Sequence, residues 1–311
     1  MEVIHDIKNF SKDKHPNIVM AIGNFDGVHL GHQFILKKVV KRAKTIKGTS
    51  LIFTFPVHPL NVLKEKGLRP QLTTLSQKLN LFRSAGMNIC LLADFNRAFA
   101  GLPPLKFARQ IIRERLQAKE IFIGENYRFG KGRKGSIKDF KKWGRKLGFK
   151  VKALPLFRLK KEPVSSTRIR ELLKEGDIRS AGKLLGRPYT ILGEVVRGSK
   201  RGISLGFPTA NITPALNLIL KDGIYAVEVE ERENLYRGLL NLGRRPTFHE
   251  QKRILEVYLF NYSGDLYGRE LSVKILRRLR GELKFNSPHD LINQIRFDIK
   301  KAKEFFTTAH C

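Results

Sequence analysis

The sequence predicts an α/β domain of the Rossmann-like type with a parallel sheet, followed by a small closed antiparallel β-barrel with a C-terminal helix. Apolar runs alternate with amphipathic helical segments through the first half of the chain. After Pro188 the runs are short and strand-like, with glycine turns between them. The length of 311 residues also exceeds the usual size of one hydrophobic core. We therefore divide the chain into domains 1–186 and 187–311.

The first domain is expected to hold a parallel sheet covered by helices on both faces. The predicted strands are 18–22, 50–55, 89–93 and 120–124, and the predicted helices are 33–44, 76–86 and 104–117. Ligands of such sheets bind at the carboxyl ends of the strands. His29, His58 and Asn126 each follow a predicted strand. We expect these three residues to share one site.

The second domain is predicted to be a barrel closed by a final helix. Its expected strands are 189–196, 223–230, 236–242, 254–261 and 270–279. Ser287 can cap the final helix, and Pro288 suits its first turn. An apolar stripe along this helix is expected to pack on the barrel, and it consists of Leu291, Ile292, Ile295, Ile299 and Ala302.

The segment from Gly23 to His32 predicts a phosphate-binding loop. It reads Gly-Asn-Phe-Asp-Gly-Val-His-Leu-Gly-His and stands between an apolar strand and an amphipathic helix. Glycines let the backbone approach a bulky anion, and a helix N-terminus attracts negative charge. The plainer alternative is a strand-turn-helix corner with two solvated histidines, and a zinc site lacks convincing third and fourth ligands nearby. The residues expected at this loop are Gly23, Phe25, Asp26, Gly27, His29, Gly31 and His32.

A second phosphate signal lies at Ser165, Ser166 and Thr167, followed by Arg170. Hydroxyl groups at a helix start bind phosphate oxygens or cap free N–H groups, and an arginine one turn later offers a forked donor to the same anion. The alternative is an ordinary helix cap. Together with the glycine-rich loop, the segment favours a phosphate site.

Net charge is the unusual feature of the composition. The chain carries +32 at pH 7 and has a pI near 10.4. Such a surface attracts polyanions, so a basic nucleic-acid-binding protein is one candidate class. However, the basic residues are spread along helix faces, and we find no helix-turn-helix, zinc-finger or aromatic RNA-recognition pattern. We therefore expect no specific nucleic-acid partner.

Hydropathy and cysteine usage predict a cytoplasmic protein. No segment approaches the ~18 consecutive apolar residues of a membrane span, and residues 1–10 contain acids and no apolar signal core. Cys90 and Cys311 form no metal or redox spacing, so reduced thiols are expected. No membrane association and no obligatory protein partner are inferred.

These motifs resemble the bacterial bifunctional riboflavin kinase and FAD synthetase family over nearly the whole chain. The first half is similar to His-x-Gly-His nucleotidyltransferases at 29–32 and 165–170. Segment 54–59 corresponds to a further family segment, with Val57 where proline is usual. Segment 124–130 corresponds to one that borders ATP and flavin in the family. The resemblance implies binding roles for His58 and Asn126. A different nucleotidyltransferase of this class is the alternative, and the second half of the chain argues against it.

The second half resembles the kinase of that family. Residues 206–211 read Gly-Phe-Pro-Thr-Ala-Asn, and the resemblance implies that Thr209 and Asn211 help hold Mg²⁺ on the ATP phosphates. Residues 197–202 form a basic loop, with Arg197 where the family often has histidine, and 241–247 match a further family segment. The implied nucleotide-binding residues of this half are Gly198, Gly202, Gly206 and Pro208.

Glu256 is the candidate general base of the kinase. Alternation in its strand places Glu256 on one face with Tyr258 and Phe260, and the family has a glutamate at this place. A carboxylate among aromatic side chains is partly desolvated, which favours uptake of a proton. The alternative is a carboxylate at a strand edge that meets solvent.

The implied function is phosphorylation of riboflavin to FMN by ATP, then adenylylation of FMN to FAD with release of pyrophosphate. A neutral hydroxyl must lose a proton in the first step, which calls for Glu256. A phosphate monoester is already an anion at neutral pH, so the second step needs positive charge and alignment instead of a base. We expect His29, His32 and Arg170 to supply them.

Overall fold

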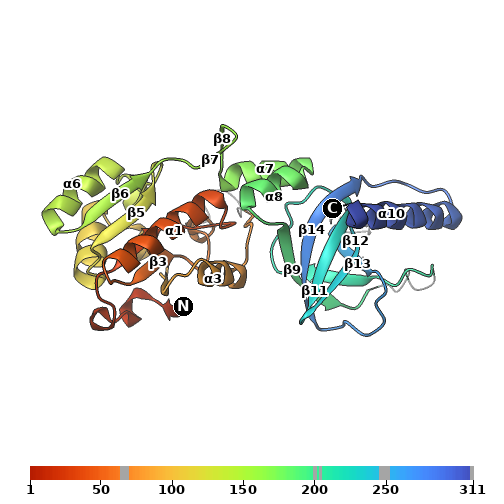
Figure 1. Ribbon diagram of the computed structural model, residues 1–311, viewed down its shortest axis with the longest axis horizontal. Helices are drawn as coiled ribbons and strands as arrows, with labels where there is room; N and C mark the ends of the chain where they lie inside the picture. Colours follow the sequence, from red (N-terminus) through yellow and green to blue (C-terminus); the bar gives the residue numbers. More distant parts are fainter. Residues whose placement is uncertain (64–69, 199–201, 203–204, 245–252, 309–311) are drawn as a thin grey trace. The chain divides into compact units, whose positions relative to one another are not determined.

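The computed structural model describes residues 1–63, 70–198, 202, 205–244 and 253–308 (Figure 1). The chain forms two compact units, Met1–Ser166 and Thr167–Cys311. The first unit holds a six-stranded parallel sheet and the second a closed six-stranded antiparallel barrel with a C-terminal helix. The predicted fold class is confirmed.

The parallel sheet has the strand order β1-β4-β3-β2-β5-β6. Its strands are β1 Glu2–His5, β2 Val19–Ile22, β3 Ser50–Thr54, β4 Ile89–Leu92, β5 Glu120–Gly124 and β6 Lys150–Leu154. The sequence analysis did not predict β1 and β6, which lie at the two edges of the sheet. A half-solvated edge strand lacks the continuous apolar run of a buried parallel strand, as the alternating lysines of β6 illustrate.

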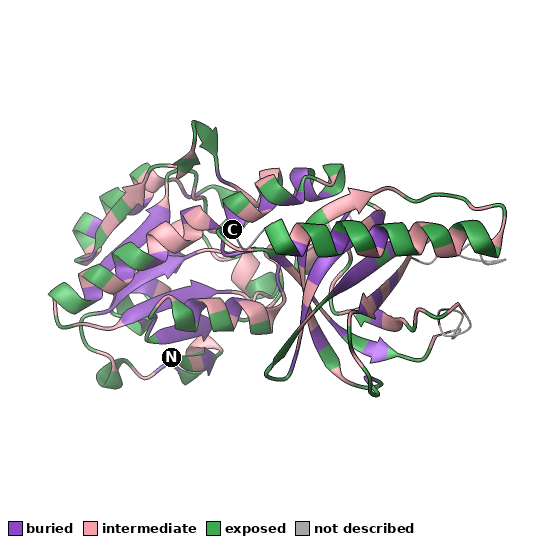
Figure 2. Ribbon diagram, turned by 45° about the vertical axis from the view of Figure 1, so that its right-hand side comes forward, coloured by how far each residue is buried: buried purple, intermediate pink, exposed green. Residues whose placement is uncertain are grey.

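Helices cover both faces of this sheet, with their apolar sides turned inward (Figure 2). One face packs on α1 (Leu30–Thr45) and α3 (Leu75–Ser84). The other packs on α6 (Ile137–Leu147) and on the helical segment Phe107–Arg115. The smaller elements of the unit are η1 Ile7–Asn9, η2 Lys12–Lys14, α2 Pro59–Leu63, α4 Arg97–Ala100, α5 Pro104–Lys106, η4 Lys131–Arg133, β7 Arg158–Leu159 and β8 Glu162–Pro163.

The helix expected at 104–117 is present, but most of it has π-helical instead of α-helical hydrogen bonding. Only α5 at its start is an α-helix, and Phe107–Arg115 is a π-helix. The N–H of Leu116, for example, donates to the carbonyl of Ile111, five residues earlier. Hydrophobic periodicity indicates a helix but cannot distinguish these windings, because their residues per turn differ only slightly.

The barrel closes in the order β10-β13-β12-β11-β14-β9. Its strands are β9 Tyr189–Val196, β10 Ala210–Pro214, β11 Gly223–Glu231, β12 Asn234–Arg244, β13 Arg253–Leu259 and β14 Glu270–Arg280. The sequence analysis missed β10, because Pro214 and the polar residues of this strand hide its alternation. The sequence predicted a motif at residues 206–211 but no strand there.

Helix α10 (Pro288–Thr308) closes the barrel unit. The hydroxyl of Ser287 accepts a hydrogen bond from the N–H of Asp290 at 3.1 Å, which confirms the predicted cap. Ile299 and Ala302 pack against the barrel residues Ala226 and Leu239, as the apolar stripe predicts.

Helices α7 (Ser166–Glu175) and α8 (Ile178–Leu185) lie almost wholly in the second unit. The sequence analysis placed them before a boundary at 186, since they continue the helical pattern of the first half. In the structure α8 packs on β9 and β14, and the N–H of Lys221 donates to the carbonyl of Leu173 at 3.1 Å.

Two remaining expectations concern thiols and membranes. Cys90 is a buried free cysteine, and Cys311 lies outside the described residues. Within the described ranges, no helix has both the length and the apolar character that a membrane span requires.

Candidate active sites

The candidate adenylyltransferase site lies at one edge of the parallel sheet. Strands β3, β2 and β5 are neighbours and run in the same direction. His29 follows β2, the half-buried His58 follows β3, and the exposed Asn126 follows β5. The structure therefore places all three after the carboxyl ends of adjacent strands. The change of crossover direction between β2 and β5 is where open α/β sheets bind ligands.

The glycine-rich loop has an unusual backbone. Phe25 and Val28 adopt φ values of 51° and 38°, in a region that side chains other than glycine rarely enter. Phe25 is buried, and a Cβ atom at Gly23 would lie 3.1 Å from its ring. At Gly31 a Cβ atom would lie 3.2 Å from the ring of His29. These two glycines thus let the aromatic ring and the imidazole pack directly on the backbone.

Asp26 holds this loop in place. Its Oδ1 accepts hydrogen bonds from the backbone N–H groups of Leu72 at 2.8 Å and Thr73 at 3.3 Å. The N–H of Gly27 donates to Oγ1 of Thr73 at 3.0 Å, and the hydroxyl of Ser166 donates to the carbonyl of Asp26 at 2.8 Å. Ser166 is therefore tied to the loop. A direct role of Asp26 in ligand binding stays a prediction.

The two histidines of the motif form a stacked pair. Their ring centroids lie 3.7 Å apart with an interplanar angle of 15°. His29 caps α1, because its Nδ1 accepts from the backbone N–H of His32 at 3.3 Å. Burial, the neighbouring His29 and then Lys78 lower the pKa of His32 well below its ordinary value. At pH 7 the His32 imidazole is therefore neutral and offers a hydrogen bond, whereas the sequence analysis expected positive charge.

Buried polar atoms without partners mark this site. Both amide atoms of Asn24 and Nδ1 of His32 are buried and make no hydrogen bond in the described part of the chain. Buried polar groups are almost always paired in proteins, so such groups in a ligand-binding loop suit a polar ligand. The sequence analysis did not select Asn24. Its position between Gly23 and Phe25 was the available signal.

Two predicted residues of this site fall in the other unit. Thr167 and Arg170 belong to Thr167–Cys311, and Arg170 is buried on α7. Their approach to the glycine-rich loop stays a prediction, as does the role of Ser165.

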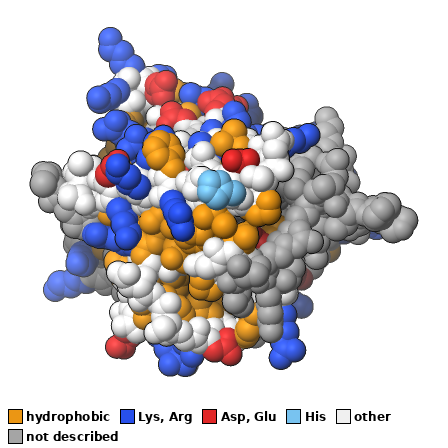
Figure 3. Space-filling view, turned by 90° about the vertical axis from the view of Figure 1, so that its right-hand side faces the viewer, with side chains coloured by type: hydrophobic (Ala, Val, Ile, Leu, Met, Phe, Trp, Pro, Cys, Tyr) orange, Lys and Arg blue, Asp and Glu red, His pale blue; other side chains and the backbone are white. Residues whose placement is uncertain are grey.

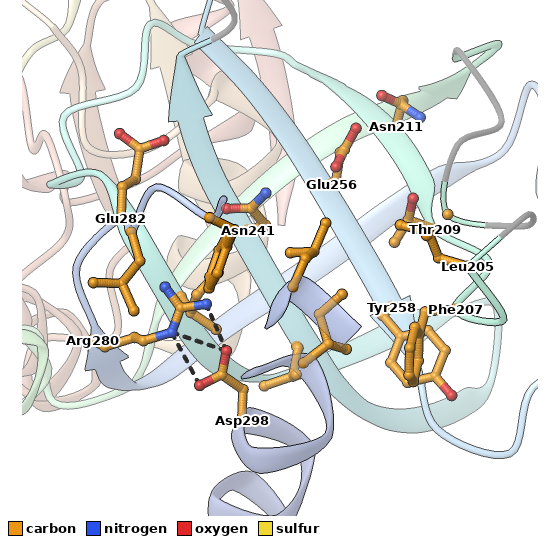
Figure 4. Close-up of a pocket in the computed structure, with 17 residues that line it drawn as sticks. Leu205, Phe207, Thr209, Asn211, Asn241, Glu256, Tyr258, Arg280, Glu282 and Asp298 are labelled. Carbon is orange, nitrogen blue, oxygen red and sulfur yellow. Dashed lines mark hydrogen bonds and ion pairs between the residues drawn. The ribbon is translucent and has the colours of Figure 1, made fainter. Parts of the chain in front are cut away.

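The candidate kinase site is a cavity of about 370 Å³ inside the second unit (Figure 4). Glu256 of β13 lies in register with Asn211 of β10 on one side and with Asn241 of β12 on the other. Paired residues of antiparallel strands face the same side. The three polar side chains therefore form one row across three strands, and all of them line the cavity.

Tight backbone contacts surround the two expected metal ligands. A Cβ atom at Gly202 would lie 3.0 Å from the hydroxyl of Thr209, and one at Gly198 would collide with the amide of Asn211. Gly206 has a φ of 82°, which favours glycine. The structure thus brings Gly198 and Gly202 to the signature segment, which contains Gly206 and Pro208. Residues 199–201 and 245–247 of the matched motifs lie outside the described residues.

The far end of the cavity holds an ion pair that the sequence analysis missed. The guanidinium of Arg280 binds the buried carboxylate of Asp298 in a bidentate manner, with an Nη2 to Oδ2 distance of 2.7 Å (Figure 4). Asp298 interrupts the apolar stripe of α10, and this interruption was the available signal. Apolar side chains also line the cavity, and they include Phe207, Tyr258, Ile224, Leu239, Leu291 and Ile295.

One face of the barrel unit is apolar at its centre (Figure 3). Figure 3 shows apolar side chains gathered in the middle of one face, with Lys and Arg side chains beside them. The cavity thus offers polar oxygens at one end, apolar walls in its middle and a charged pair at the other end. It suits a ligand that is flat and apolar over much of its length and carries a hydroxyl group at one end.

Comparisons with known proteins agree with this division. A family model described as FAD synthetase matches residues 11–168, and one described as riboflavin kinase matches residues 185–306. A solved structure described as a macrolide-efflux protein from Streptococcus pneumoniae is similar, with a TM-score of 0.87, 29% identity and coverage of 97% of this chain and 99% of that one.

Curated relatives match over nearly the full length. The bifunctional riboflavin kinase/FMN adenylyltransferase of Buchnera aphidicola (Schizaphis graminum) is 38% identical over 98% of this chain and 99% of its own. Those of Escherichia coli K12 and Bacillus subtilis are 34% and 36% identical, over 98% and 95% of both chains. With both catalytic halves matched in the same order, the chain belongs to the bifunctional riboflavin kinase/FMN adenylyltransferase family.

Proposed function

We propose that this chain makes FAD in two steps, with riboflavin kinase in residues 187–311 and FMN adenylyltransferase in residues 1–186. The family and the named relatives support both activities. The observation that carries the assignment of residues is the row of Asn211, Glu256 and Asn241 inside an apolar cavity. A carboxylate placed beside amide side chains at one end of such a cavity suits a bound polyol.

In the kinase step, Glu256 accepts the proton of the ribityl 5′-hydroxyl of riboflavin. The hydroxyl oxygen then forms a bond to the γ-phosphorus of ATP while the bond from that phosphorus to ADP breaks. Half-buried between Asn211 and Asn241 in the cavity wall, Glu256 remains accessible to a bound substrate. Asn241 and Asn211 offer hydrogen bonds that orient the polyol and the phosphates.

Thr209 and Asn211 would hold a magnesium ion. Their hydroxyl and amide oxygens are hard donors, and two protein ligands leave room for phosphate oxygens and water. The absence of a side chain at Gly198 and Gly202 lets the Asn211 amide and the Thr209 hydroxyl lie directly against the backbone of these two residues. When bound, Mg²⁺ neutralises charge that develops on the phosphates. No cluster of three or more His, Cys, Asp or Glu side chains that could hold a metal occurs among the described residues.

In the adenylyltransferase step, a phosphate oxygen of FMN bonds to the α-phosphorus of a second ATP and pyrophosphate leaves. No general base is required, because the FMN phosphate is already ionised. The loop of residues 23–32 supplies the N-terminus of α1 and hydrogen bonds from the stacked histidine pair. Arg170, Ser165 and Thr167 are proposed to contribute phosphate contacts, and His58 and Asn126 to border the nucleotide and the flavin.

Product analysis tests this proposal directly. With riboflavin, ATP and Mg²⁺, chromatography should show FMN first and then FAD. With FMN in place of riboflavin, FAD should form without a lag, and a chelator should abolish FMN formation. If FAD forms from FMN but riboflavin is never phosphorylated, the cavity in the barrel is not a kinase site and another nucleotidyltransferase is favoured.

We expect a piece containing residues 167–311 to convert riboflavin to FMN and to stop there. A piece containing 187–311 retains the same cavity but lacks α8, which packs on β9 and β14. It should form the same product and unfold at a lower temperature, since apolar surface of the barrel is uncovered. Circular dichroism melting and chromatography measure both properties. A folded 167–311 piece that makes no FMN would contradict the assignment.

We expect the positive charge to cause only sequence-independent binding of nucleic acid. A groove of the first unit collects basic side chains around the buried Glu120, namely Lys119, Lys141, Arg145, Lys150 and Lys152. Affinity that arises from release of counterions should fall steeply with salt, with a logarithmic slope of about −0.7 per phosphate contact for single strands. Fluorescence anisotropy with several unrelated oligonucleotides measures it. A salt-resistant complex with one defined sequence would support the nucleic-acid-binding alternative.

A further inference from the structure

Lys78 is a cation buried beside the candidate adenylyltransferase site. It lies on α3, is 1% exposed, and donates from Nζ to the carbonyl oxygen of Phe55 at 3.0 Å. An ammonium group has three donors, and this carbonyl is the one acceptor that the described residues give it. Burying a charged group costs free energy, so a lysine in this position calls for a physical role.

Helix α3 is fastened to the glycine-rich loop. Asp26 accepts from the N–H groups of Leu72 and Thr73, and Thr74 caps the helix directly afterwards. One turn later Lys78 reaches the residue that follows β3. The Lys78 side chain thus connects α3, which the loop after β2 holds, with the carboxyl end of β3. The carboxyl ends of β2 and β3 both belong to the candidate site.

The charge of Lys78 also acts on the histidine pair. His32 is stacked on His29, meets the edge of the Phe25 ring, and has Nδ1 buried without a partner in the described residues. Lys78 contributes to the lowered pKa of His32, after burial and His29. Burial lowers the pKa of Lys78 itself, and the neighbouring Asp26 partly opposes this shift by favouring the charged form. The other titratable group around Lys78 is Cys90, whose thiol pKa burial raises to about 12. Cys90 therefore brings no negative charge at neutral pH.

We propose that Lys78 is a positioning residue for adenylyl transfer, which holds the carboxyl end of β3 and provides the positive field in which the stacked His29 and His32 act on the nucleotide. The field favours a neutral His32 imidazole, which donates a hydrogen bond to a phosphate oxygen and accepts one elsewhere. It also compensates part of the negative charge that two ionised phosphates bring together. The proposal rests on the assignment of adenylyl transfer to residues 1–186.

Three substitutions separate the two effects of this side chain. Lys78→Arg keeps the charge, Lys78→Gln keeps a donor for Phe55 without the charge, and Lys78→Met removes both. Arg83→Met is the matched control, because it removes an exposed cation from the same helix. The full chain is used throughout, and its riboflavin kinase activity reports whether the protein remains intact.

The first measurement is the titration of His32 by NMR, with the resonance assigned by its absence in His32→Gln. We expect the midpoint to rise by about 0.5–1 pH unit in Lys78→Gln and Lys78→Met, and to stay at the wild-type value in Lys78→Arg and Arg83→Met. This measurement needs no turnover, so it tests the field even if adenylyl transfer occurs elsewhere. An unchanged midpoint in Lys78→Gln would overturn the proposal.

The second measurement is the pH profile of FAD formation from FMN. We expect Lys78→Gln to lose about 10–100-fold at pH 7 and its acid limb to move to higher pH, while Lys78→Arg retains most activity. A loss of the same factor at every pH would mean a purely structural role and would also overturn the proposal. If Lys78→Met fails to fold, Lys78→Gln alone decides, because it keeps a hydrogen-bond donor on the side of Phe55.

Discussion

Glu256→Gln should reduce the rate of FMN formation by about 10²–10⁴-fold, because the amide keeps the size and hydrogen bonding of the side chain but cannot accept the hydroxyl proton. Conversion of added FMN to FAD should continue at the wild-type rate. The variant is assayed by chromatography with riboflavin and, separately, with FMN as substrate. The structure favours this substitution over alanine, since Glu256 lies between Asn211 and Asn241 and an amide preserves that row.

The matched control for this variant is Glu270→Gln. Glu270 is an exposed acid at the start of β14, in the same barrel but outside the cavity. It should leave both reactions unchanged, because surface substitutions of this kind alter little. A Glu256→Gln kinase with full activity would eliminate the proposed base.

His32→Ala should show the reverse pattern. Removing the imidazole deletes a hydrogen bond to the nucleotide and the stacking partner of His29, so FAD formation should fall by about 10²–10³-fold. Riboflavin should still be phosphorylated, and FMN should accumulate. The measurement is the ratio of FMN to FAD over time with riboflavin as the only flavin supplied.

His5→Ala serves as the control in the same unit, since His5 is an exposed residue at the end of β1. Comparing His32→Ala with Glu256→Gln on both substrates yields a crossed pattern that global misfolding cannot produce. Equal loss of both reactions in His32→Ala would count against the assignment of His32 to the second step alone.

Local sequence alone was sufficient for the two fold classes and for the glycine-rich loop. The buried strands β2, β3, β4 and β5 are short apolar runs, and each appears in the sequence whatever its neighbours are. The loop residues 23–32 are contiguous, so their chemistry could be recognised before any fold was known. Alternation also placed Glu256 on the face with Tyr258, and both line the cavity.

Tertiary structure decided which distant residues complete each site. The pairing of β13 with β10 and β12 sets Glu256 between two asparagines, and no local pattern specifies that pairing. The grouping of α7 and α8 with the barrel likewise depends on which surface their apolar sides cover. Periodicity shows which face of an element is apolar but not which partner covers it.

Tertiary structure also determined which charged side chains are buried. Lys78 and Asp298 are charged residues within amphipathic helices, and sequence patterns predict that such residues are exposed to solvent. In the fold, Lys78 meets the carbonyl of Phe55, and Asp298 meets Arg280 at one end of the barrel cavity. The sequence by itself thus determined the elements, the contiguous motifs and the family resemblance. The buried polar contacts depended on tertiary packing, because a charge is stable inside a protein only where residues distant in sequence supply its partners.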